Sequence, residues 1–407
     1  MIYDIIIIGA GPAGLFTAAN VEKKTNSLIL NNTGSPGKKL LISGAGQCNI
    51  TNTGKIKDFL SRYGDNGIKI RKALYGFSNI SLINYLENKG INCFRREDGK
   101  VFPSSMNGRD LLELLLNRLK NNGFKLINDV EIRSVEYIEE KKIFQLRDDV
   151  DRTYKCLKLV VATGGLSYPK TGSNGMLTDS LKSIGLEIIP MKEALVPIYV
   201  ENYPYSSLSG TSFKKAKVVI GKHQKTGSLL FTHKNLSGPV ILDMSRYANS
   251  GETIRINYLG DVSREELMVK FNDRRPGCVK LARTIIYETL TKLSTDVTKR
   301  YVDLLCEIAG VGDKVRFAEL KKDVLKKIVE MVCEDSYMIT GNAGFNVAMC
   351  TTGGVSLDEI DVETFEVKKY PGMYVIGEAL DVDGDTGGFN IQFAFTSGYV
   401  CAKHVLG

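Results

Sequence analysis

Three glycines near the start of the chain have the spacing of a phosphate-binding turn. Gly9, Gly11 and Gly14 form the pattern G-x-G-x-x-G, between a predicted buried strand at residues 3–8 and a predicted helix at residues 12–24. There the first glycine permits a tight turn, the second lets the backbone approach a pyrophosphate, and the third lets helix and sheet pack closely. The helix N-terminus also favours an anion, because its N–H groups are unpaired. The pattern predicts a dinucleotide site; the alternative is a glycine-rich turn without a ligand.

A polar residue follows the second predicted strand, where a ribose would lie. The strand at residues 28–30 ends at Asn31. Dinucleotide sites usually carry an acidic residue about 20 positions after the glycines, and its carboxylate accepts hydrogen bonds from the ribose hydroxyls. An asparagine can still accept through its carbonyl oxygen. We therefore expect Asn31 to contact the ribose without contributing a negative charge.

Two further blocks combine glycines with polar groups. Residues 37–49, GKKLLISGAGQCN, contain Lys39, which could balance phosphate charge, and Ser43, which could donate to a pyrophosphate or a flavin together with the glycine amides. The alternative for this block is an exposed polar loop. The tetrapeptide A-T-G-G at residues 162–165 ends an apolar strand, which is where flavoproteins commonly bring the chain back beside the dinucleotide.

The last block lies near the end of the chain and is rich in acidic residues and glycine. Residues 377–392 read GEALDVDGDTGGFNIQ, and Glu378 or one of the following aspartates could bind the ribityl hydroxyls of a flavin. Gly387 and Gly388 precede a final helix, whose N-terminus could face the flavin pyrimidine and stabilise the reduced anion. The alternating acidic residues also resemble the start of a calcium loop, but its closing glutamate is missing.

Three side chains are candidates for catalysis, each with a structural alternative. His233 could act as a general acid opposite a hydride, or it could fix a turn together with Ser237. Cys48 could face a flavin, or it could be a buried structural thiol. Tyr168 could donate a proton, although the following Pro169 also suits a simple turn.

The composition is that of an ordinary globular protein, with 43% hydrophobic and 25% charged residues. The net charge of +8 is spread along the chain, which suits a solvated surface and is also compatible with an anionic substrate or RNA. No apolar run reaches the roughly 18–20 residues of a membrane span, and the opening segment is too short for a signal peptide. The eight cysteines include no C-x-x-C pair, so we expect no metal site and a cytoplasmic protein.

The pattern of predicted strands and helices changes along the chain and later returns, which suggests a discontinuous domain. The β-turn-α-β opening indicates a doubly wound α/β sheet. We expect a cofactor domain at residues 1–190 and 341–407, interrupted by an antiparallel β domain at residues 191–262 and a helical segment at residues 263–340.

The four blocks together resemble the HI0933-like flavoprotein family, which includes aminoacetone oxidase-like and BaiN-like members. Segments such as SGAGQCNITN, ATGGLSYPKTGSNG and GEALDVDGDTGGFNIQFAFTSG carry the resemblance over nearly the whole chain. It implies a glutathione-reductase-like FAD-binding Rossmann domain with an inserted β-barrel-like domain and a helical segment. The FAD contacts that it implies are Gly9, Gly11, Ala13, Gly14, Lys39, Ser43, Gly44, Val130, Thr163, Gly164, Glu378, Asp383, Asn390 and Ile391. The chain departs from the family at Asn31, usually Glu, and at Gln47, usually Arg.

The resemblance implies flavin N5 hydride chemistry, for which three substrates are open. The leading hypothesis is an FAD-dependent oxidoreductase that reduces an unsaturated or carbonyl-type small molecule with electrons from NAD(P)H. Two other enzymatic hypotheses are reduction of uridine to dihydrouridine in ribosomal RNA and oxidation of an amine. A non-enzymatic hypothesis is a regulatory protein that binds flavin without turnover. The only other G-x-G, at Gly310 and Gly312, follows a helical stretch. We therefore expect NAD(P)H to dock transiently, without a Rossmann domain of its own.

Overall fold

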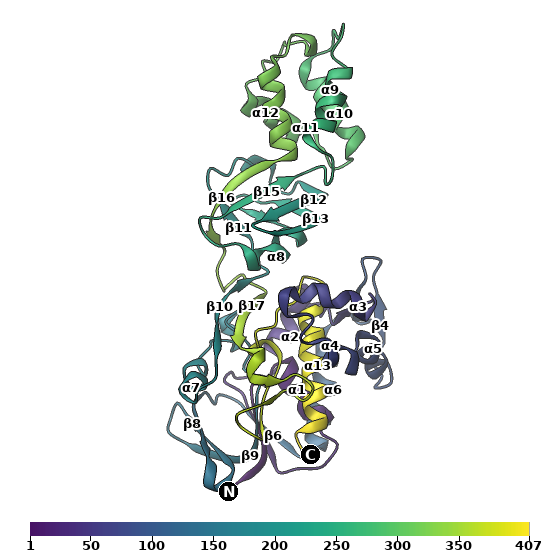
Figure 1. Cartoon of the computed structure of the whole chain (residues 1–407). Helices are drawn as coiled ribbons and strands as arrows, with labels where there is room; N and C mark the ends of the chain where they lie inside the picture. The colour runs from purple at the N-terminus through teal and green to yellow at the C-terminus, as the bar shows by residue number, and fades with distance from the viewer. Residues whose placement is uncertain (407) are drawn as a thin grey trace. The chain divides into compact units, whose positions relative to one another are not determined.

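The computed structural model describes residues 1–406, which form two compact units (Figure 1). Unit 1 comprises Met1–Ala194 and the chain from Phe345 onward, and unit 2 comprises Leu195–Gly344. The expected boundaries were residue 190, where the first part of the cofactor domain ends, and residue 341, where its second part begins. Both boundaries lie four residues later in the structure, at Ala194 and Phe345. Each unit has its own cluster of buried hydrophobic side chains.

Unit 1 is an α/β structure. Its helices are α1 (Pro12–Asn20), α2 (Lys38–Ile42), α3 (Ile56–Phe59), α4 (Arg71–Gly76), α5 (Asn79–Glu87), α6 (Gly108–Asn121), α7 (Thr178–Ser183) and α13 (Phe389–His404). Its strands are β1 (Tyr3–Ile8), β2 (Ser27–Leu30), β3 (Thr51–Asn52), β4 (Cys93–Arg95), β5 (Lys100–Pro103), β6 (Phe124–Ile127), β7 (Ile132–Ile138), β8 (Ile143–Asp148), β9 (Thr153–Val161), β10 (Ile188–Ala194), β17 (Cys350–Val355), β18 (Ile360–Asp361), β19 (Glu366–Val367) and β20 (Met373–Val375).

A parallel core of strands brings both ends of the chain into one sheet. The nine-stranded sheet has the order β18-β19-β20-β9-β1-β2-β6, with β7 and β8 as an antiparallel hairpin beside β9. Strand β1 pairs in parallel with β2 and β9, and β9 pairs in parallel with β20. The last four residues of β1 are buried, as expected for a strand covered on both faces. The carboxyl ends of these strands therefore meet at one edge.

Two helices far apart in sequence cross closely in unit 1. Helices α1 and α13 lie side by side in Figure 1, and the Thr17 hydroxyl of α1 donates to the Gly398 carbonyl of α13 over 3.1 Å. A Cβ atom at Gly398 would lie 2.7 Å from the Ala13 carbonyl oxygen. Only glycine fits at this crossing, so the first and last blocks of the sequence are held together.

Unit 2 is a closed barrel that carries five helices. The barrel has the order β11-β14-β13-β12-β15-β16. Its strands are β11 (Ile198–Val200), β12 (Ser212–Ile220), β13 (His223–Phe231), β14 (Leu236–Ser237), β15 (Thr253–Asn257) and β16 (Asp335–Asn342), and its helices are α8 (Pro239–Met244), α9 (Arg264–Asp273), α10 (Ala282–Leu293), α11 (Lys299–Ala309) and α12 (Lys322–Cys333).

The helical segment is an insertion between two barrel strands. Helices α9 to α12 leave the barrel after β15, and the chain returns as β16, which pairs with β15 and β11. Residues 335–340, expected in the helical segment, thus belong to the barrel, because β16 is needed to close it. Gly310 ends α11 in the left-handed conformation, so the second G-x-G is a helix-ending loop, as expected.

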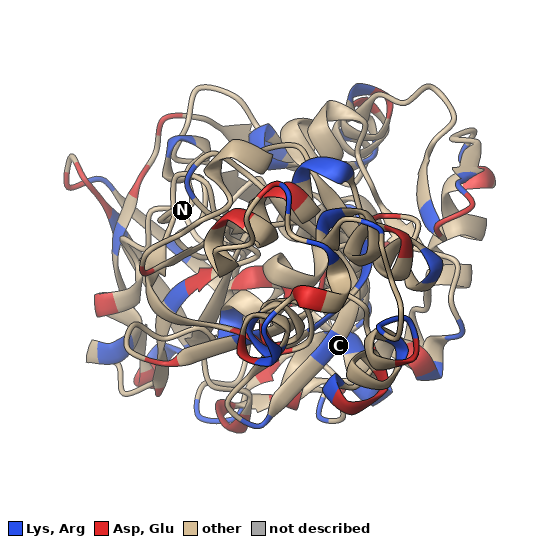
Figure 2. Ribbon diagram, turned by 90° about the horizontal axis from the view of Figure 1, so that it is seen from above, with Lys and Arg blue, Asp and Glu red and all other residues tan. Residues whose placement is uncertain are grey.

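Charged residues are interspersed over the molecule (Figure 2). Residues 195–344 nevertheless contain 23 Lys and Arg against 17 Asp and Glu, an excess of six, whereas the whole chain has an excess of eight. Most of the positive excess therefore lies in unit 2. Within residues 1–406, no helix combines the length and the apolar character that crossing a membrane would require.

Candidate functional site

The glycine turn of unit 1 is shaped by three different constraints. Gly9 has φ +106°, and a Cβ atom there would lie 2.3 Å from the Ala162 carbonyl oxygen. A Cβ atom at Gly14 would lie 2.1 Å from the Gly9 carbonyl oxygen, so this residue permits the close packing of α1 on β1. At Gly11 a Cβ atom would meet nothing within 4 Å. The space beside Gly11, at the N-terminus of α1, is thus clear of protein and suits a phosphate.

A cleft opens at the carboxyl ends of β1 and β2. Three residues expected at the cofactor, Gly9, Val130 and Thr163, line it. The remaining lining residues were not expected: Ile8, Leu30, Asn32, Glu131, Ile132, Gly172, Asn174, Met176 and Leu177. A crevice at the carboxyl ends of parallel strands is where α/β sheets of this kind bind nucleotides. The signal for Gly172 and Asn174 was present in the segment ATGGLSYPKTGSNG, which continues past A-T-G-G.

Asn31 is buried beside this cleft, with its side-chain amide engaged by the protein. Its Nδ2 donates to the Thr33 carbonyl oxygen at 2.6 Å and to Asn128 Oδ1 at 2.9 Å. The backbone N–H of Val130 donates to the Asn31 carbonyl oxygen at 3.0 Å, so β2 and the segment before β7 are joined here. With Nδ2 committed to protein acceptors, the side-chain oxygen is the atom that suits a ribose hydroxyl.

The block around Lys39 divides into a short helix and an exposed loop. Lys39 lies in α2, and Ser43 follows it with its hydroxyl donating to the Leu40 carbonyl oxygen at 2.7 Å. Gly44, Ala45 and Gly46 all have positive φ, between 57° and 86°, and their side of the loop is exposed. Gly44 and Gly46 suit this loop, because a left-handed backbone carries no steric cost for glycine.

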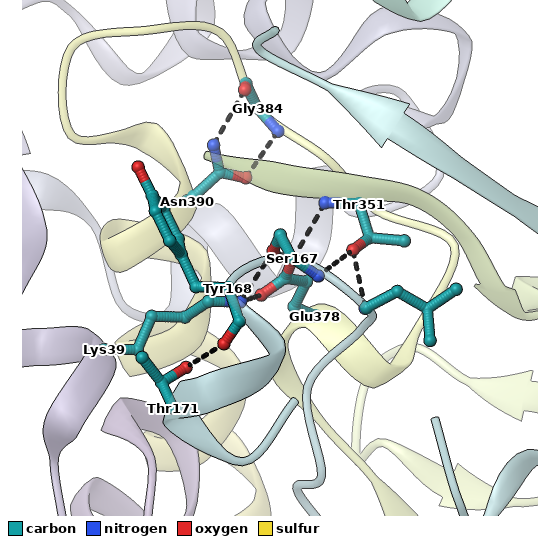
Figure 3. Close-up of polar contacts among 9 residues, drawn as sticks. Lys39, Ser167, Tyr168, Thr171, Thr351, Glu378, Gly384 and Asn390 are labelled. Carbon is teal, nitrogen blue, oxygen red and sulfur yellow. Dashed lines mark hydrogen bonds and ion pairs between the residues drawn. The ribbon is translucent and has the colours of Figure 1, made fainter. Parts of the chain in front are cut away.

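Lys39, expected to balance phosphate charge, and Glu378, expected at the ribityl hydroxyls, form an ion pair in unit 1. Lys39 Nζ lies 2.6 Å from Glu378 Oε2, and each side chain is 19% exposed. Lys39 also donates to Ser167 Oγ at 2.7 Å, and Ser167 donates to Glu378 Oε1 at 2.7 Å (Figure 3). The Thr351 N–H donates to the same carboxylate oxygen at 2.8 Å. Four segments distant in sequence therefore hold one partly buried carboxylate.

Ser167 and Thr351 were not expected in the site. The Thr351 hydroxyl accepts from the N–H groups of Leu166 and Ser167, at 2.8 and 3.1 Å, so β17 also fixes the loop after β9. Gly165 allows this approach, because a Cβ atom there would lie 2.4 Å from Thr351 Oγ1. Ser167 occurs in the quoted family segment ATGGLSYPKTGSNG, but nothing in the local sequence of either residue predicts a bond to Glu378.

The final block packs against the N-terminus of α13. Asp383 is buried, and Asn390 is joined to Gly384 by two hydrogen bonds of 2.8 Å, one in each direction (Figure 3). Ile391 is half-buried in the first turn of α13. Gly388, at φ +95°, precedes the helix without a capping side chain. The helix therefore begins at Phe389, as expected from the two glycines, and its first N–H groups point toward this block.

The three catalytic candidates lie in different environments. Cys48 is fully buried, and burial raises the pKa of its thiol to about 11, so the thiol stays neutral near pH 7 and does not favour a catalytic role. Tyr168 is half-buried at φ +51°, with its N–H donating to the Phe345 carbonyl oxygen at 3.0 Å. Such a backbone conformation is costly for a tyrosine and is typical of functional sites.

His233 lies on an exposed bend of unit 2, between β13 and β14. The bend is fixed by Thr232, whose hydroxyl donates to the Asn235 carbonyl oxygen at 2.9 Å. The structural alternative for His233 was that it fixes this turn together with Ser237. In the structure, Thr232 and Asn235 fix the turn instead.

Comparison with known proteins agrees with this geometry. The family described as HI0933-like protein Rossmann domain matches residues 3–404. The chain is 32% identical over 405 residues to a ribosomal RNA dihydrouridine synthase of Haemophilus influenzae, covering 98% of each chain. It is 26% identical over 411 residues to a 3-dehydro-bile acid delta(4,6)-reductase of Clostridium scindens, covering 98% of this chain and 97% of the relative.

A solved structure shows the same fold at low identity. The 3-ketosteroid delta1-dehydrogenase of Sterolibacterium denitrificans matches with a TM-score of 0.53 and 12% identity, over 99% of both chains. The expected Rossmann fold with an inserted barrel is thus confirmed, and so is the expected family. Because the family match covers almost every residue, the chain belongs to the HI0933-like family and is an FAD-dependent oxidoreductase.

Proposed function

We propose that this enzyme reduces a carbon–carbon double bond conjugated to a carbonyl group in a small molecule, with electrons from NAD(P)H. The observation that carries the proposal is the glycine turn of unit 1, where the space beside Gly11 is clear of protein and Gly9 lines the cleft together with Val130 and Thr163. Support also comes from the name of the Clostridium scindens relative, a delta(4,6)-reductase. When bound, FAD supplies a hydride from N5 of its isoalloxazine ring.

The residues of unit 1 fit FAD along one path. The turn of Gly9, Gly11, Ala13 and Gly14 would hold the diphosphate at the N-terminus of α1. Asn31 would accept from the adenosine ribose, and Val130 would line the adenine end. Thr163, which lines the cleft beside Gly9, would lie near the diphosphate. The remaining expected contacts would hold the riboflavin half: Lys39, Ser43, Gly44, Gly164, Glu378, Asp383, Asn390 and Ile391.

The carboxylate of Glu378 suits a ribityl hydroxyl. Ser167 and the Thr351 N–H occupy its Oε1, while Lys39 approaches Oε2 and compensates its charge. These contacts fix the orientation of the Glu378 carboxylate, and its oxygens can still accept a further hydrogen bond. Within the described chain, Tyr168 is the candidate that combines partial burial with a backbone fixed by hydrogen bonds. We propose Tyr168 as the proton donor, with His233 on unit 2 as the second candidate.

An anaerobic reduction experiment tests the proposal. The FAD-loaded protein is mixed with NADPH or NADH, and the flavin absorbance is followed; we expect bleaching with one of the two nucleotides. A panel of unsaturated ketones and acids is then tested for reoxidation of the reduced flavin. If neither nucleotide bleaches the flavin, or if saturated and unsaturated acceptors reoxidise it equally, the proposed reaction is wrong. The Tyr168→Phe variant should retain bleaching and lose turnover with the acceptor.

A second candidate substrate is a uridine of ribosomal RNA, whose ring contains the same conjugated double bond. The specific observation in its favour is the positive excess of unit 2, with exposed lysines such as Lys214, Lys215 and Lys222 on the β12–β13 hairpin. The relative from Haemophilus influenzae carries a name of this kind. Comparing the dihydrouridine content of ribosomal RNA with and without the gene tests it, because unchanged RNA would remove this candidate.

A further inference from the structure

One border of the cleft in unit 1 is a short segment that is tied down at both ends. Residues Gly172–Leu177, here called the strap, lie between a 3₁₀ turn at Pro169–Thr171 and helix α7. Gly172, Asn174, Met176 and Leu177 line the cleft. Asn32, which follows β2, donates from Nδ2 to the Gly172 carbonyl oxygen at 2.8 Å. The first end of the strap is therefore attached to the β2 side of the cleft.

The other end of the strap is attached to the start of β7. The side-chain amide of Asn174 donates to Glu131 Oε1, and Arg133 forms an ion pair with Glu131 Oε2 at 2.8 Å. Arg133 also donates to the Met176 sulfur at 3.4 Å. Glu131 itself lines the cleft. These contacts form a latch of four side chains at the rim, and each partner of Glu131 holds a different carboxylate oxygen.

The backbone of the strap requires glycine at two positions. Gly172 has φ +105°, and a Cβ atom there would lie 2.4 Å from Asn32 Oδ1. Gly175 has φ +71°, and a Cβ atom there would lie 2.5 Å from Leu166 Cδ2. Asn174 and Met176 are exposed, whereas Ser173 and Leu177 are buried, so the latch side chains lie on the outer side of a strap that is also held by these two buried residues.

The chemistry of the cleft points to one part of a dinucleotide. Its lining includes the apolar side chains of Ile8, Leu30, Val130 and Ile132, which suit the face of a flat heteroaromatic ring. Polar groups lie at the rim, where Glu131 can accept from an exocyclic amino group. The cleft also lies next to Gly9, at the turn that suits the diphosphate.

We propose that the strap closes over the adenosine end of FAD, with Glu131 held by Asn174 and Arg133 as the residue that recognises the adenine amino group. This inference rests on the FAD site of the proposed function. None of the latch residues is among the expected FAD contacts. The latch should therefore affect the binding of the adenosine half of FAD and leave the binding of the riboflavin half unchanged.

Binding measurements on the whole chain test the strap without any turnover. The apoprotein is titrated with FAD, with ADP and with FMN, which lacks the adenosine half. We expect Asn174→Ala and Arg133→Gln each to raise the Kd of FAD and of ADP about tenfold, as for the loss of one hydrogen bond to a charged group. The Kd of FMN should stay unchanged, and FAD should dissociate correspondingly faster. Glu136→Gln, on the exposed side of the same strand β7, is the matched control and should bind all three ligands as the unchanged protein does.

Each outcome bears on the proposal. Unchanged FAD and ADP affinity in both latch variants would overturn it, and so would equal weakening of FAD and FMN, which indicates a general loss of structure. An unchanged protein that binds neither FAD nor ADP would also overturn it. If the affinities change as expected but NAD(P)H does not bleach the flavin, the role of the strap is supported and the proposed reaction is wrong.

Discussion

A buried carboxylate in unit 2 should make the stability of the barrel depend on pH. Asp335 begins β16 and is 7% exposed. Its Oδ2 accepts from Tyr258 at 2.7 Å and from Tyr205, and Tyr337 donates to the Tyr205 hydroxyl at 3.2 Å. Within residues 1–406 no Lys or Arg pairs with it. Burial raises the pKa of the Asp335 carboxyl from 3.8 to about 6, because the tyrosine hydroxyls replace only part of its hydration.

The direction and size of the effect follow from proton linkage. The folded protein binds the proton more tightly than the unfolded chain, so the free energy of unfolding falls as pH rises from about 4 to about 6 and stays lower above that range. A shift of about two pKa units corresponds to about 3 kcal/mol. For a unit of this size, that difference should lower the melting temperature by about 6–12 °C.

The assay compares Asp335→Asn with the unchanged protein from pH 4 to pH 7. The chain has no tryptophan, so thermal unfolding is followed by near-ultraviolet circular dichroism of its tyrosines. We expect the variant to become relatively more stable as pH rises, by about 3 kcal/mol in total. Asp261→Asn is the control, because Asp261 is exposed in the same unit and its pair with Lys217 contributes little. A melting-temperature difference that stays constant across this pH range would refute the reasoning.

Three further predictions concern unit 1. Gly14→Ala should abolish FAD binding or folding, since its Cβ atom would lie 2.1 Å from the Gly9 carbonyl oxygen; flavin content after purification measures this, and a fully loaded variant would contradict it. Ser167→Ala should weaken FAD about tenfold, because Glu378 loses one of its donors, and titration of the apoprotein checks it against Ser167→Thr, which keeps the hydroxyl. In the folded protein Cys48 should react with iodoacetamide at least about a hundredfold more slowly than in the unfolded chain, because its pKa is raised from 9.0 to about 11; equal labelling rates by mass spectrometry would count against its burial.

Much of the site was predictable because its signals are local. The strand, glycines and helix of residues 3–24 are neighbours in sequence, and Gly14 is required by a backbone contact with Gly9 in the same turn. The glycines before α13 likewise predicted where the last helix begins, because a left-handed residue before an apolar run is a local feature. The remaining cofactor blocks were expected from the family resemblance, and the family itself is confirmed over residues 3–404.

The tertiary structure decided which of those residues contact one another. The pairing of Lys39 with Glu378, and the support of that pair by Ser167 and Thr351, joins four segments that lie up to 339 positions apart. No periodicity or propensity encodes such contacts, because they depend on how β9, β17 and the helices pack. The same reason applies to β16, which follows four helices and yet closes the barrel. Sequence by itself determined the turns and the kind of cofactor. Packing determined which charged and polar side chains meet around Glu378, because those contacts join strands and helices from distant parts of the chain.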